Sequence, residues 1–412
     1  MRSQLPPFRA LETALGATTE RLAHELAAPT LIAPEWTQFE WGIARAVAAM
    51  QGISGLLARG LRWRGPADWS KFLVEQEQQT QLRQQRVAEI CSRLDASMRR
   101  RGICVIALKG AALHDIGVYR PGERPMGDVD LLIRPLDVDA VAGAIAELGY
   151  REAYATRRHR VFEPDEPARL AAFGEHAGNP LQIEVHTHVA EGLPIRAVDI
   201  TSDLWPRTAV PGLNRYSSTA MLMKHLLLHA AGNMRSRALR GIQLHDIALL
   251  AGRMNAEDWR SLIAGGVNSR WWMLPPLLLT ARYYGDVFPA DLMNVLRRDC
   301  PALLRRIAGR HALKDVSWSK IRIQAFPGME WVRSPKEAAM FAKSRIWPSH
   351  RALTELRIGA VHGGVDRVVP WYGQSHPVRI LRWIFSRPPR VQTMRVLLAM
   401  RAGETPVSEA GR

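Results

Sequence analysis

Two apolar runs joined by a loop rich in proline and glycine constrain the fold of this chain most. The first run, residues 103–108, ends at the turn Lys109-Gly110, and the second, residues 129–133, directly follows Asp128. Short apolar runs bounded by turn residues predict buried strands. Because side chains alternate between the two faces of a strand, Asp128 and Asp130 are expected to project to the same side. Such a pair invites a divalent cation.

Length, charge and cysteine usage bound the class of protein. The chain has 412 residues, of which 47% are hydrophobic and 23% charged, as is usual for a folded protein of two or three domains. Its net charge of +17 predicts an anionic partner: a nucleotide, a nucleic acid, an acidic polymer or an anionic membrane surface. Three widely spaced cysteines argue against a disulfide framework or a zinc site, so we expect a reducing, cytoplasmic location. We find neither a signal peptide at the start nor an apolar run of membrane-spanning length.

Changes in hydrophobic periodicity and charge along the chain predict an α+β fold with four regions. Only the second region alternates between strand and helix patterns, and we expect it to form a small mixed-sheet core flanked by N- and C-terminal helical regions. The regions are an N-terminal helical region at 1–102, the core at 103–212, a helical domain at 213–330 and a basic C-terminal region at 331–412.

Several helix boundaries follow from capping residues and prolines. Thr18-Thr19-Glu20 is expected to start a helix, and a long helix is expected from Pro66 to Gly102. Ser217-Ser218-Thr219 is expected to cap another helix. Pro275-Pro276 and Pro289 are expected to break the helices that follow.

A later strand carries a polar face. In residues 181–189, Gln182, Glu184, His186 and His188 alternate with apolar residues and therefore share one side. A face of this kind either meets solvent or lines a site. For His186, a ligand or supporting role, a polar surface position and a hydrogen-bonded core position all remain open.

Histidines recur on the following helices. His225 and His229 are four residues apart, a spacing that can bind zinc, but no glutamate lies between them and no third ligand is fixed by the sequence. We therefore favour packed, hydrogen-bonded helices. Asp246, next to His245, either steadies one of these histidines or lines a cleft.

The order of these motifs resembles a known family. Leu108-Lys109-Gly110 ends one strand, Arg124 stands four residues before Asp128-Val129-Asp130, and a later strand carries Glu184-Val185-His186. This combination resembles the nucleotidyltransferase superfamily related to DNA polymerase beta. Within it, the chain resembles the bacterial uncharacterised nucleotidyltransferases, which carry a Leu-Lys-Gly turn and an Arg-x-x-x-Asp-x-Asp-x-Leu signature. The match is close in the central third.

The resemblance implies a metal site. In the superfamily the Asp-x-Asp pair binds two divalent cations, which here falls on Asp128 and Asp130. A third carboxylate from a neighbouring strand completes the site, and Glu184 is the best placed candidate, with an alternative role as base for the acceptor. The cofactor would be Mg²⁺, with two ions expected and Mn²⁺ as an alternative.

The phosphate-binding turn departs from better known members of the superfamily, which have Gly-Ser where this chain has Lys109-Gly110. Gly110 would let the backbone approach a phosphate, and Lys109 would supply a point charge. Arg124 is expected to clamp a phosphate, with Arg120 as a weaker candidate.

The function implied is an enzyme activity: a nucleotidyltransferase that moves an NMP from an NTP such as ATP to a hydroxyl or phosphate of an unknown acceptor. Two rivals remain open, a nucleotide-binding regulator that has lost catalysis and a scaffold whose basic tail binds nucleic acid or anionic membrane.

The basic tail motivates the second rival. Residues 331–401 carry 13 arginines and lysines against three acidic residues, with tryptophans interspersed. Residues 378–385 and 391–400 are expected to form basic amphipathic helices. A solvated face and a contact with nucleic acid or anionic membrane explain this pattern equally well.

Overall fold

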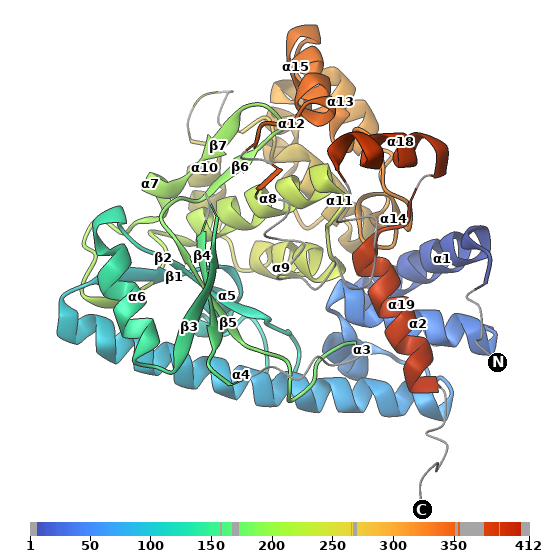
Figure 1. The fold of residues 1–412 in the computed structure, drawn as a ribbon, viewed down its shortest axis with the longest axis horizontal. Helices are drawn as coiled ribbons and strands as arrows, with labels where there is room; N and C mark the ends of the chain where they lie inside the picture. The colour runs from blue at the N-terminus through green and yellow to red at the C-terminus, as the bar shows by residue number, and fades with distance from the viewer. Residues whose placement is uncertain are drawn as a thin grey trace, which may run out of the picture.

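A mixed sheet of six strands lies within a larger set of helices, which confirms the α+β class (Figure 1). The computed structural model describes residues 6–156, 159–166, 173–264, 266, 270–350, 353–354, 375–386 and 388–404, with the backbone alone at 384, 386 and 401–404. The strands of the sheet are β1 (Cys104–Ala107), β2 (Asp128–Leu132), β3 (Tyr150–Ala155), β4 (His159–Pro164), β5 (Gln182–His186) and β8 (Gly212–Asn214). A separate hairpin consists of β6 (Ala190–Gly192) and β7 (Ala197–Asp199).

The strand order is β3-β4-β5-β2-β1-β8. The two apolar runs that opened the sequence are neighbouring antiparallel strands, β1 and β2, near the centre of the sheet. On its other side β2 pairs with β5 in parallel, with Asp130 opposite Glu184. The sequence did not predict β3, because its residues Tyr-Arg-Glu-Ala-Tyr-Ala form no apolar run.

Four N-terminal helices precede the sheet: α1 (Phe8–Ala27), α2 (Gln38–Gln51), α3 (Ser54–Gly60) and α4 (Ala67–Arg101). The long helix predicted between Pro66 and Gly102 is confirmed as α4, and Gly102 ends it in the left-handed conformation. In Figure 1, α4 runs along the lower edge of the molecule, beneath the sheet.

The two faces of the sheet have different environments. One face packs with α4 and α6 (Val138–Ala146), which follows the short turn η1 (Pro135–Asp137), in a core that includes Leu94, Val129 and Ile183. Because side chains alternate along β2, the opposite face carries Asp128 and Asp130 toward the C-terminal helices. A dry core therefore supports one side of the strands whose other side is polar.

The C-terminal helices cover that polar face, and α8 contacts both α9 and β6. Their bounds are α7 (Thr201–Leu204), α8 (Thr219–Ser236), α9 (Gly241–Ala251), α10 (Ala256–Leu262), α11 (Leu274–Tyr284), α12 (Ala290–Asp299), α13 (Ala302–Ala308), α14 (Leu313–Val316), η3 (Met329–Trp331), α15 (Pro335–Ile346), α18 (His376–Ser386) and α19 (Val391–Glu404). The predicted cap at Ser218 is confirmed, because its side chain accepts a hydrogen bond from the Met221 N–H.

Two helix predictions were wrong. Thr18 and Thr19 do not start a helix but lie buried in the middle of α1, where the Thr19 hydroxyl donates to Ser319. Pro275 and Pro276 do not break a helix but stand at the first turn of α11, where a missing N–H costs nothing. Both errors arise because the same residue types serve at helix starts and elsewhere.

The two predicted tail helices exist as α18 and α19, but their packing differs. On α19, Leu397 and Met400 belong to the main hydrophobic core, so the expected amphipathic surface helix is instead a packed one. On α18, Leu381 and Phe385 are exposed. Arg351, Arg357, Arg367 and Arg387, which contribute to the basic tail, lie outside the described residues. Among the described residues, no helix is both long and apolar enough to cross a membrane.

Candidate active site

Three carboxylates meet on the polar face of the sheet. Asp128 and Asp130 come from β2 and Glu184 from β5, and each offers one oxygen within 4.8 Å of the other two. The parallel register that sets Asp130 opposite Glu184 explains this meeting. The structure therefore brings together the three residues that the sequence singled out for a metal site.

A lysine balances the most buried of these carboxylates. The Lys109 Nζ lies 2.8 Å from Oδ1 of Asp130, whose side chain is 5% exposed. Burial opposes ionisation of Asp130, but the charge of Lys109 and the hydrogen bond from His186 hold its pKa well below the usual range. The same carboxylates raise the pKa of Lys109 despite its burial. Both groups are charged.

Asp128 behaves differently from its neighbour. Burial and the nearby Asp130 carboxylate raise the pKa of Asp128 to about 6. Two negative charges held close together in a buried place repel each other, so one of them retains its proton more readily. The carboxylate cluster carries more negative charge than Lys109 balances, which is the condition under which it would attract a further cation.

Two histidines complete the cluster. The Nε2 atom of His186 lies 3.0 Å from Asp130 Oδ1 and 3.5 Å from Glu184 Oε2. His159 on β4 pairs with His186 across the strands, and its Nε2 lies 3.8 Å from the same Glu184 oxygen. Among the alternatives for His186, the structure favours a site position over a surface one. His159 was missed because its strand carries no other sign of a site.

The backbone of Lys109 is held in an unusual conformation. Its φ of +46° lies in the left-handed region, which side-chain-bearing residues rarely adopt and which costs on the order of 1–3 kcal/mol. Its N–H donates to the Tyr216 hydroxyl, which lies 2.7 Å from His225 Nδ1. Burial, together with the charge of Lys109, keeps the pKa of His225 well below its ordinary value. His225 is therefore a neutral partner that supports Lys109, as the packed, hydrogen-bonded interpretation expected.

Arg124 forms a second buried ion pair. Its Nε and Nη2 atoms contact the two oxygens of Asp246 at 2.7 and 2.9 Å, and the Tyr119 hydroxyl donates to the same carboxylate at 2.6 Å. Asp246 thus steadies an arginine and not a histidine, and it also lines the cavity beside Lys109, as the cleft alternative expected. The absence of a side chain at Gly110 leaves room for the Arg124 guanidinium, because a Cβ at Gly110 would lie 2.5 Å from Arg124 Nη1.

Comparison with known proteins now bears on this site. The model of the family described as uncharacterised nucleotidyltransferase matches residues 37–289, more than half of the chain. The chain belongs to this family. No curated protein and no solved structure matches it. All the site residues named above lie within the matched span, and the family supports a function of nucleotidyltransferase type with an NTP as substrate.

In this family member two cavities flank Lys109. One, of about 250 Å³, is lined by Lys109, Gly110, Arg124, both aspartates of the pair and Arg240 of the α8–α9 connection. The other, of about 160 Å³, is lined by Lys109 and by the cluster of His159, Glu184 and His186. His229 of α8 lines both cavities. The carboxylates therefore stand between two spaces.

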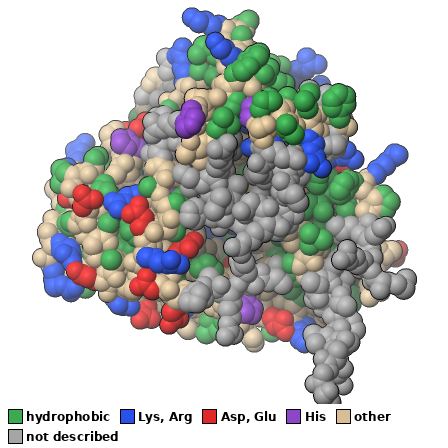
Figure 2. Space-filling view, viewed as in Figure 1, with side chains coloured by type: hydrophobic (Ala, Val, Ile, Leu, Met, Phe, Trp, Pro, Cys, Tyr) green, Lys and Arg blue, Asp and Glu red, His purple; other side chains and the backbone are tan. Residues whose placement is uncertain are grey.

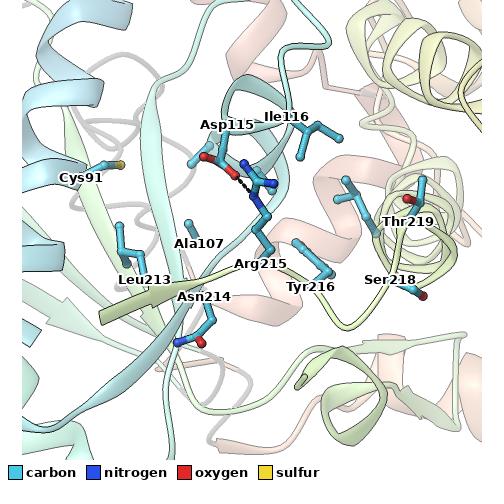
Figure 3. A pocket seen from close by; sticks show the side chains of 13 residues that line it. Cys91, Ala107, Asp115, Ile116, Leu213, Asn214, Arg215, Tyr216, Ser218 and Thr219 are labelled. Atoms are coloured by element: carbon cyan, nitrogen blue, oxygen red, sulfur yellow. Dashed lines mark hydrogen bonds and ion pairs between the residues drawn. The ribbon is translucent and has the colours of Figure 1, made fainter. Parts of the chain in front are cut away.

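A larger cavity of about 400 Å³ lies elsewhere, between α4, α5 (Lys109–Asp115) and the start of α8 (Figure 3). Figure 3 shows Arg215 directed at Asp115, with an ion pair of 2.6 Å. None of the three carboxylates lines this cavity. Cavity volume alone would therefore select a place without the three carboxylates, so we assign the candidate active site by its charged groups instead.

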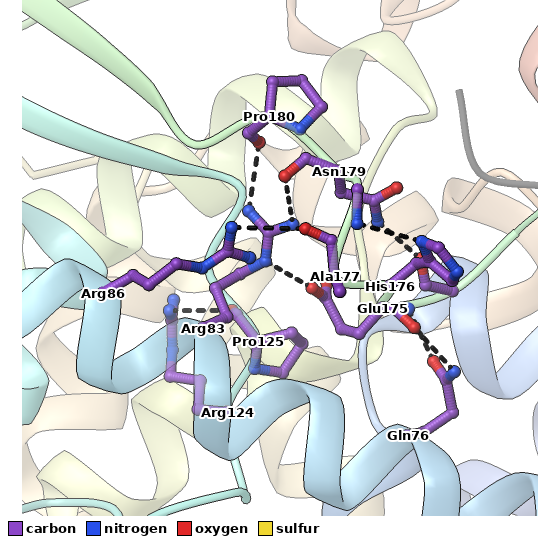
Figure 4. Close-up of polar contacts among 12 residues, drawn as sticks. Gln76, Arg83, Arg86, Arg124, Pro125, Glu175, His176, Ala177, Asn179 and Pro180 are labelled. Atoms are coloured by element: carbon purple, nitrogen blue, oxygen red, sulfur yellow. Dashed lines mark hydrogen bonds and ion pairs between the residues drawn. The ribbon is translucent and has the colours of Figure 1, made fainter. Parts of the chain in front are cut away.

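A buried arginine of α4 anchors the segment that leads into β5 (Figure 4). Arg83 is 2% exposed, lies 2.6 Å from Glu175, and donates to the carbonyl oxygens of Asn179 and Pro180. Gln76 adds two hydrogen bonds to the backbone of Glu175. Because β5 begins at Gln182, these contacts fix the strand that carries Glu184. The sequence of the long helix gave no sign of this role for Arg83.

Proposed function

We propose that this protein is a metal-dependent nucleotidyltransferase that moves an NMP from an NTP to a hydroxyl or phosphate of an acceptor, with pyrophosphate leaving. The observation that carries the proposal is the convergence of Asp128, Asp130 and Glu184 beside Lys109. We also propose that the fold belongs to the superfamily related to DNA polymerase beta, that the catalytic core corresponds to residues 103–212, and that the enzyme works in the cytoplasm, where its three free cysteines would stay reduced.

The residues present fit divalent cations. Three carboxylate oxygens within 4.8 Å of one another form the hard oxygen donor set that Mg²⁺ prefers. The Lys109 ammonium, 2.8 Å from Asp130, already holds a cationic charge at this place. We expect Asp128, Asp130 and Glu184 to hold the metal, with Mg²⁺ as the cofactor in the cell. Bound there, it would neutralise charge on the transferring phosphate and favour ionisation of the acceptor hydroxyl.

The side chains that line the two cavities suggest where the triphosphate and the acceptor bind. The cavity of about 250 Å³ carries Arg124, Arg240 and Lys109, so we assign the triphosphate to it. The acceptor then enters the cavity of about 160 Å³, whose wall includes Glu184, so that the metal-binding carboxylates face the acceptor hydroxyl. Lys109 lines both cavities, and its ammonium would contact the phosphate that passes between them.

Two of Arg124's donor groups already contact Asp246, which limits its role. Nη1 is the part of the guanidinium that lies against Gly110, which lines the same cavity, and it makes a long hydrogen bond of 3.5 Å to the Pro125 carbonyl oxygen. We therefore expect Arg124 to bind a phosphate through Nη1 while Asp246 holds its orientation, in place of a clamp that uses both edges of the fork.

The test is transfer of label from an NTP labelled on its α-phosphate to acceptors in a cell extract. Asp128→Asn combined with Asp130→Asn should abolish transfer, because both carboxylates lose their charge. The chain offers a matched control in Asp137-Val138-Asp139, a second Asp-x-Asp whose Asp139 is exposed. Asp137→Asn with Asp139→Asn should transfer label as the wild type does. Turnover retained in the first double variant would overturn the proposal.

A second function is favoured by α18, because its side chains Leu381 and Phe385 are 55% and 84% exposed beside an exposed Arg382. Figure 2 likewise shows basic and hydrophobic side chains together at the top of the molecule, over α15. We propose that residues 331–412 also contact an anionic membrane surface, since an exposed aliphatic side chain such as Leu381 can enter the acyl-chain boundary but has no ring to stack on a base.

Vesicle flotation tests this membrane contact. Wild type should float with vesicles containing phosphatidylserine but not with neutral ones, and added salt should weaken the binding. Leu381→Asp with Phe385→Asp should lose it, whereas Leu136→Asp, at a position that is 82% exposed on η1, should retain it. Equal flotation of all three proteins would contradict the contact.

A further inference from the structure

The cluster next to the carboxylates contains nitrogen ligands. His159 from β4 and His186 from β5 point their Nε2 atoms at one oxygen of Glu184, at 3.8 and 3.5 Å. These three ligand atoms all lie within 4.8 Å of one another, and Glu184 is shared with the group of Asp128 and Asp130. Two overlapping ligand sets of different chemistry thus meet at one glutamate.

The spacing of these atoms suits a single small ion. Ligands about 2.0–2.1 Å from a tetrahedral zinc ion are separated from one another by roughly 3.4 Å. The two contacts to Glu184 Oε2 are within a few tenths of an ångström of that separation. Both strands are held by sheet pairing, with His159 directly opposite His186, so the ligands are arranged before any ion binds.

The donor atoms decide the kind of ion. Carboxylate oxygens suit Mg²⁺, whereas two imidazoles and one carboxylate suit Zn²⁺ and related transition metals. Three protein ligands facing a cavity of about 160 Å³ also leave a coordination position open for water or an acceptor atom. A centre with Mg²⁺ alone would use His186 only as a hydrogen-bond partner of Asp130 and would leave His159 without a role.

We propose that His159, Glu184 and His186 form a second cation site that takes a transition-metal ion of the Zn²⁺ type, with Glu184 bridging to the Mg²⁺ site of Asp128 and Asp130. The role of this ion at the acceptor side rests on the proposed function. Its binding does not, because the ligands belong to the protein alone. The two cation sites therefore differ in their ligands: one has carboxylate oxygens alone, and the other has two imidazole nitrogens and a carboxylate oxygen.

A titration of the full-length, chelator-treated protein with Co²⁺ tests the site without any nucleotide. Co²⁺ held in a four-coordinate site by two imidazoles and a carboxylate gives intense visible absorption bands, whereas hydrated, octahedral Co²⁺ absorbs only weakly. We expect one such ion per chain, displaced by Zn²⁺ but not by an equal concentration of Mg²⁺. His159→Gln should weaken binding at least tenfold and remove the bands. His188→Gln is the matched control, because His188 is an exposed histidine that lines the same cavity outside the cluster.

A wild type without these bands, or His159→Gln binding Co²⁺ as tightly as wild type, would overturn the site. Melting temperatures of both variants without metal show whether His159→Gln is folded, and His159→Asn provides a second variant if it is not. Since the titration contains no NTP, bands that depend on His159 support the site even in a protein without turnover. Their absence overturns it even in an active enzyme.

Discussion

Two buried ion pairs, Lys109 with Asp130 and Arg124 with Asp246, border the same cavity but are built differently. Lys109 offers a point charge to one carboxylate oxygen, and that carboxylate also faces His186 and the Asp128–Glu184 cluster. Arg124 binds both oxygens of its partner, and Tyr119 adds a hydrogen bond. We therefore expect the first pair to exchange its cation more readily than the second.

The difference between the two ion pairs indicates which one holds the fold and which one takes part in cation binding. A bidentate pair inside a buried hydrogen-bond network holds α9 against the loop that precedes β2. A point charge on a strained backbone leaves Asp130 available to other cations. We therefore expect damage to the Arg124 pair to affect the fold first, and damage to the Lys109 pair to affect metal and nucleotide binding first.

The largest effect is expected from Asp246→Asn. It leaves Arg124 buried without a counter-charge, which costs about 3–5 kcal/mol when a buried pair is broken on one side. Urea unfolding should show this loss, and Mg²⁺ should not restore it. As a control, Asp139→Asn removes an exposed carboxylate and should cost less than about 1 kcal/mol. A loss below 1 kcal/mol for Asp246→Asn would remove the distinction between the pairs.

Lys109→Met should make the protein's stability depend on metal. With the ammonium gone, the carboxylates need another cation, so Mg²⁺ at about 100 times its Kd should add about 2.7 kcal/mol. In wild type the ion competes with Lys109 for Asp130 and should stabilise less. Thermal unfolding with and without EDTA measures both. Equal Mg²⁺ stabilisation of the two proteins would show that Lys109 and the metal do not share a place.

Acid should destabilise the protein through its buried, neutral histidines, one of which, His114, lies beside Arg124. Burial and the charge of Arg124 lower the pKa of His114 to about 4, from an ordinary value near 6.5. Between these values the unfolded chain binds a proton that the folded chain does not, so stability falls as pH drops from 6.5 toward 4. His114→Gln should reduce the loss between pH 7 and 5 by about 1–2 kcal/mol. Parallel pH profiles of both proteins would contradict this.

Tyr216→Phe should have the smallest effect on stability. It removes the acceptor of the Lys109 N–H, a loss of about 1 kcal/mol, and lets the strained turn relax. Transfer activity should fall several-fold. Tyr283→Phe is the matched control, because the Tyr283 hydroxyl accepts a hydrogen bond from the Leu313 N–H far from the carboxylates. This variant should lose a similar amount of stability and keep the wild-type kcat. Equal activity of both variants would contradict a positioning role for Tyr216.

The sequence predicted the carboxylate half of the site but not its supports. Alternation along two strands places Asp128, Asp130 and Glu184 on one face, and this depends only on local geometry. The partner of Arg124 is 122 residues away and depends on how α9 docks. Long-range side-chain partners of this kind leave no periodic signal.

The two helices of the basic C-terminal region, α18 and α19, also differ in a way that depends on tertiary packing. Both tail helices carry basic and apolar residues, but α18 gathers its apolar residues on one face while α19 spreads them around the helix, and Leu397 of α19 is fully buried whereas Leu381 of α18 is 55% exposed. Whether a neighbouring helix covers an apolar stripe is decided by tertiary packing. α19 contacts α2, a helix from the far end of the chain.

Metal-dependent nucleotide binding tests the central claim most directly. Calorimetric titration with ATP, CTP, GTP and UTP, with Mg²⁺ or EDTA, would compare wild type, the Asp128→Asn/Asp130→Asn variant and the Asp137→Asn/Asp139→Asn variant. We predict that wild type and the surface variant bind at least one NTP at least tenfold more tightly with Mg²⁺, and that the site variant loses this difference. Mg²⁺-dependent binding retained by the site variant would contradict the claim that these carboxylates hold the metal.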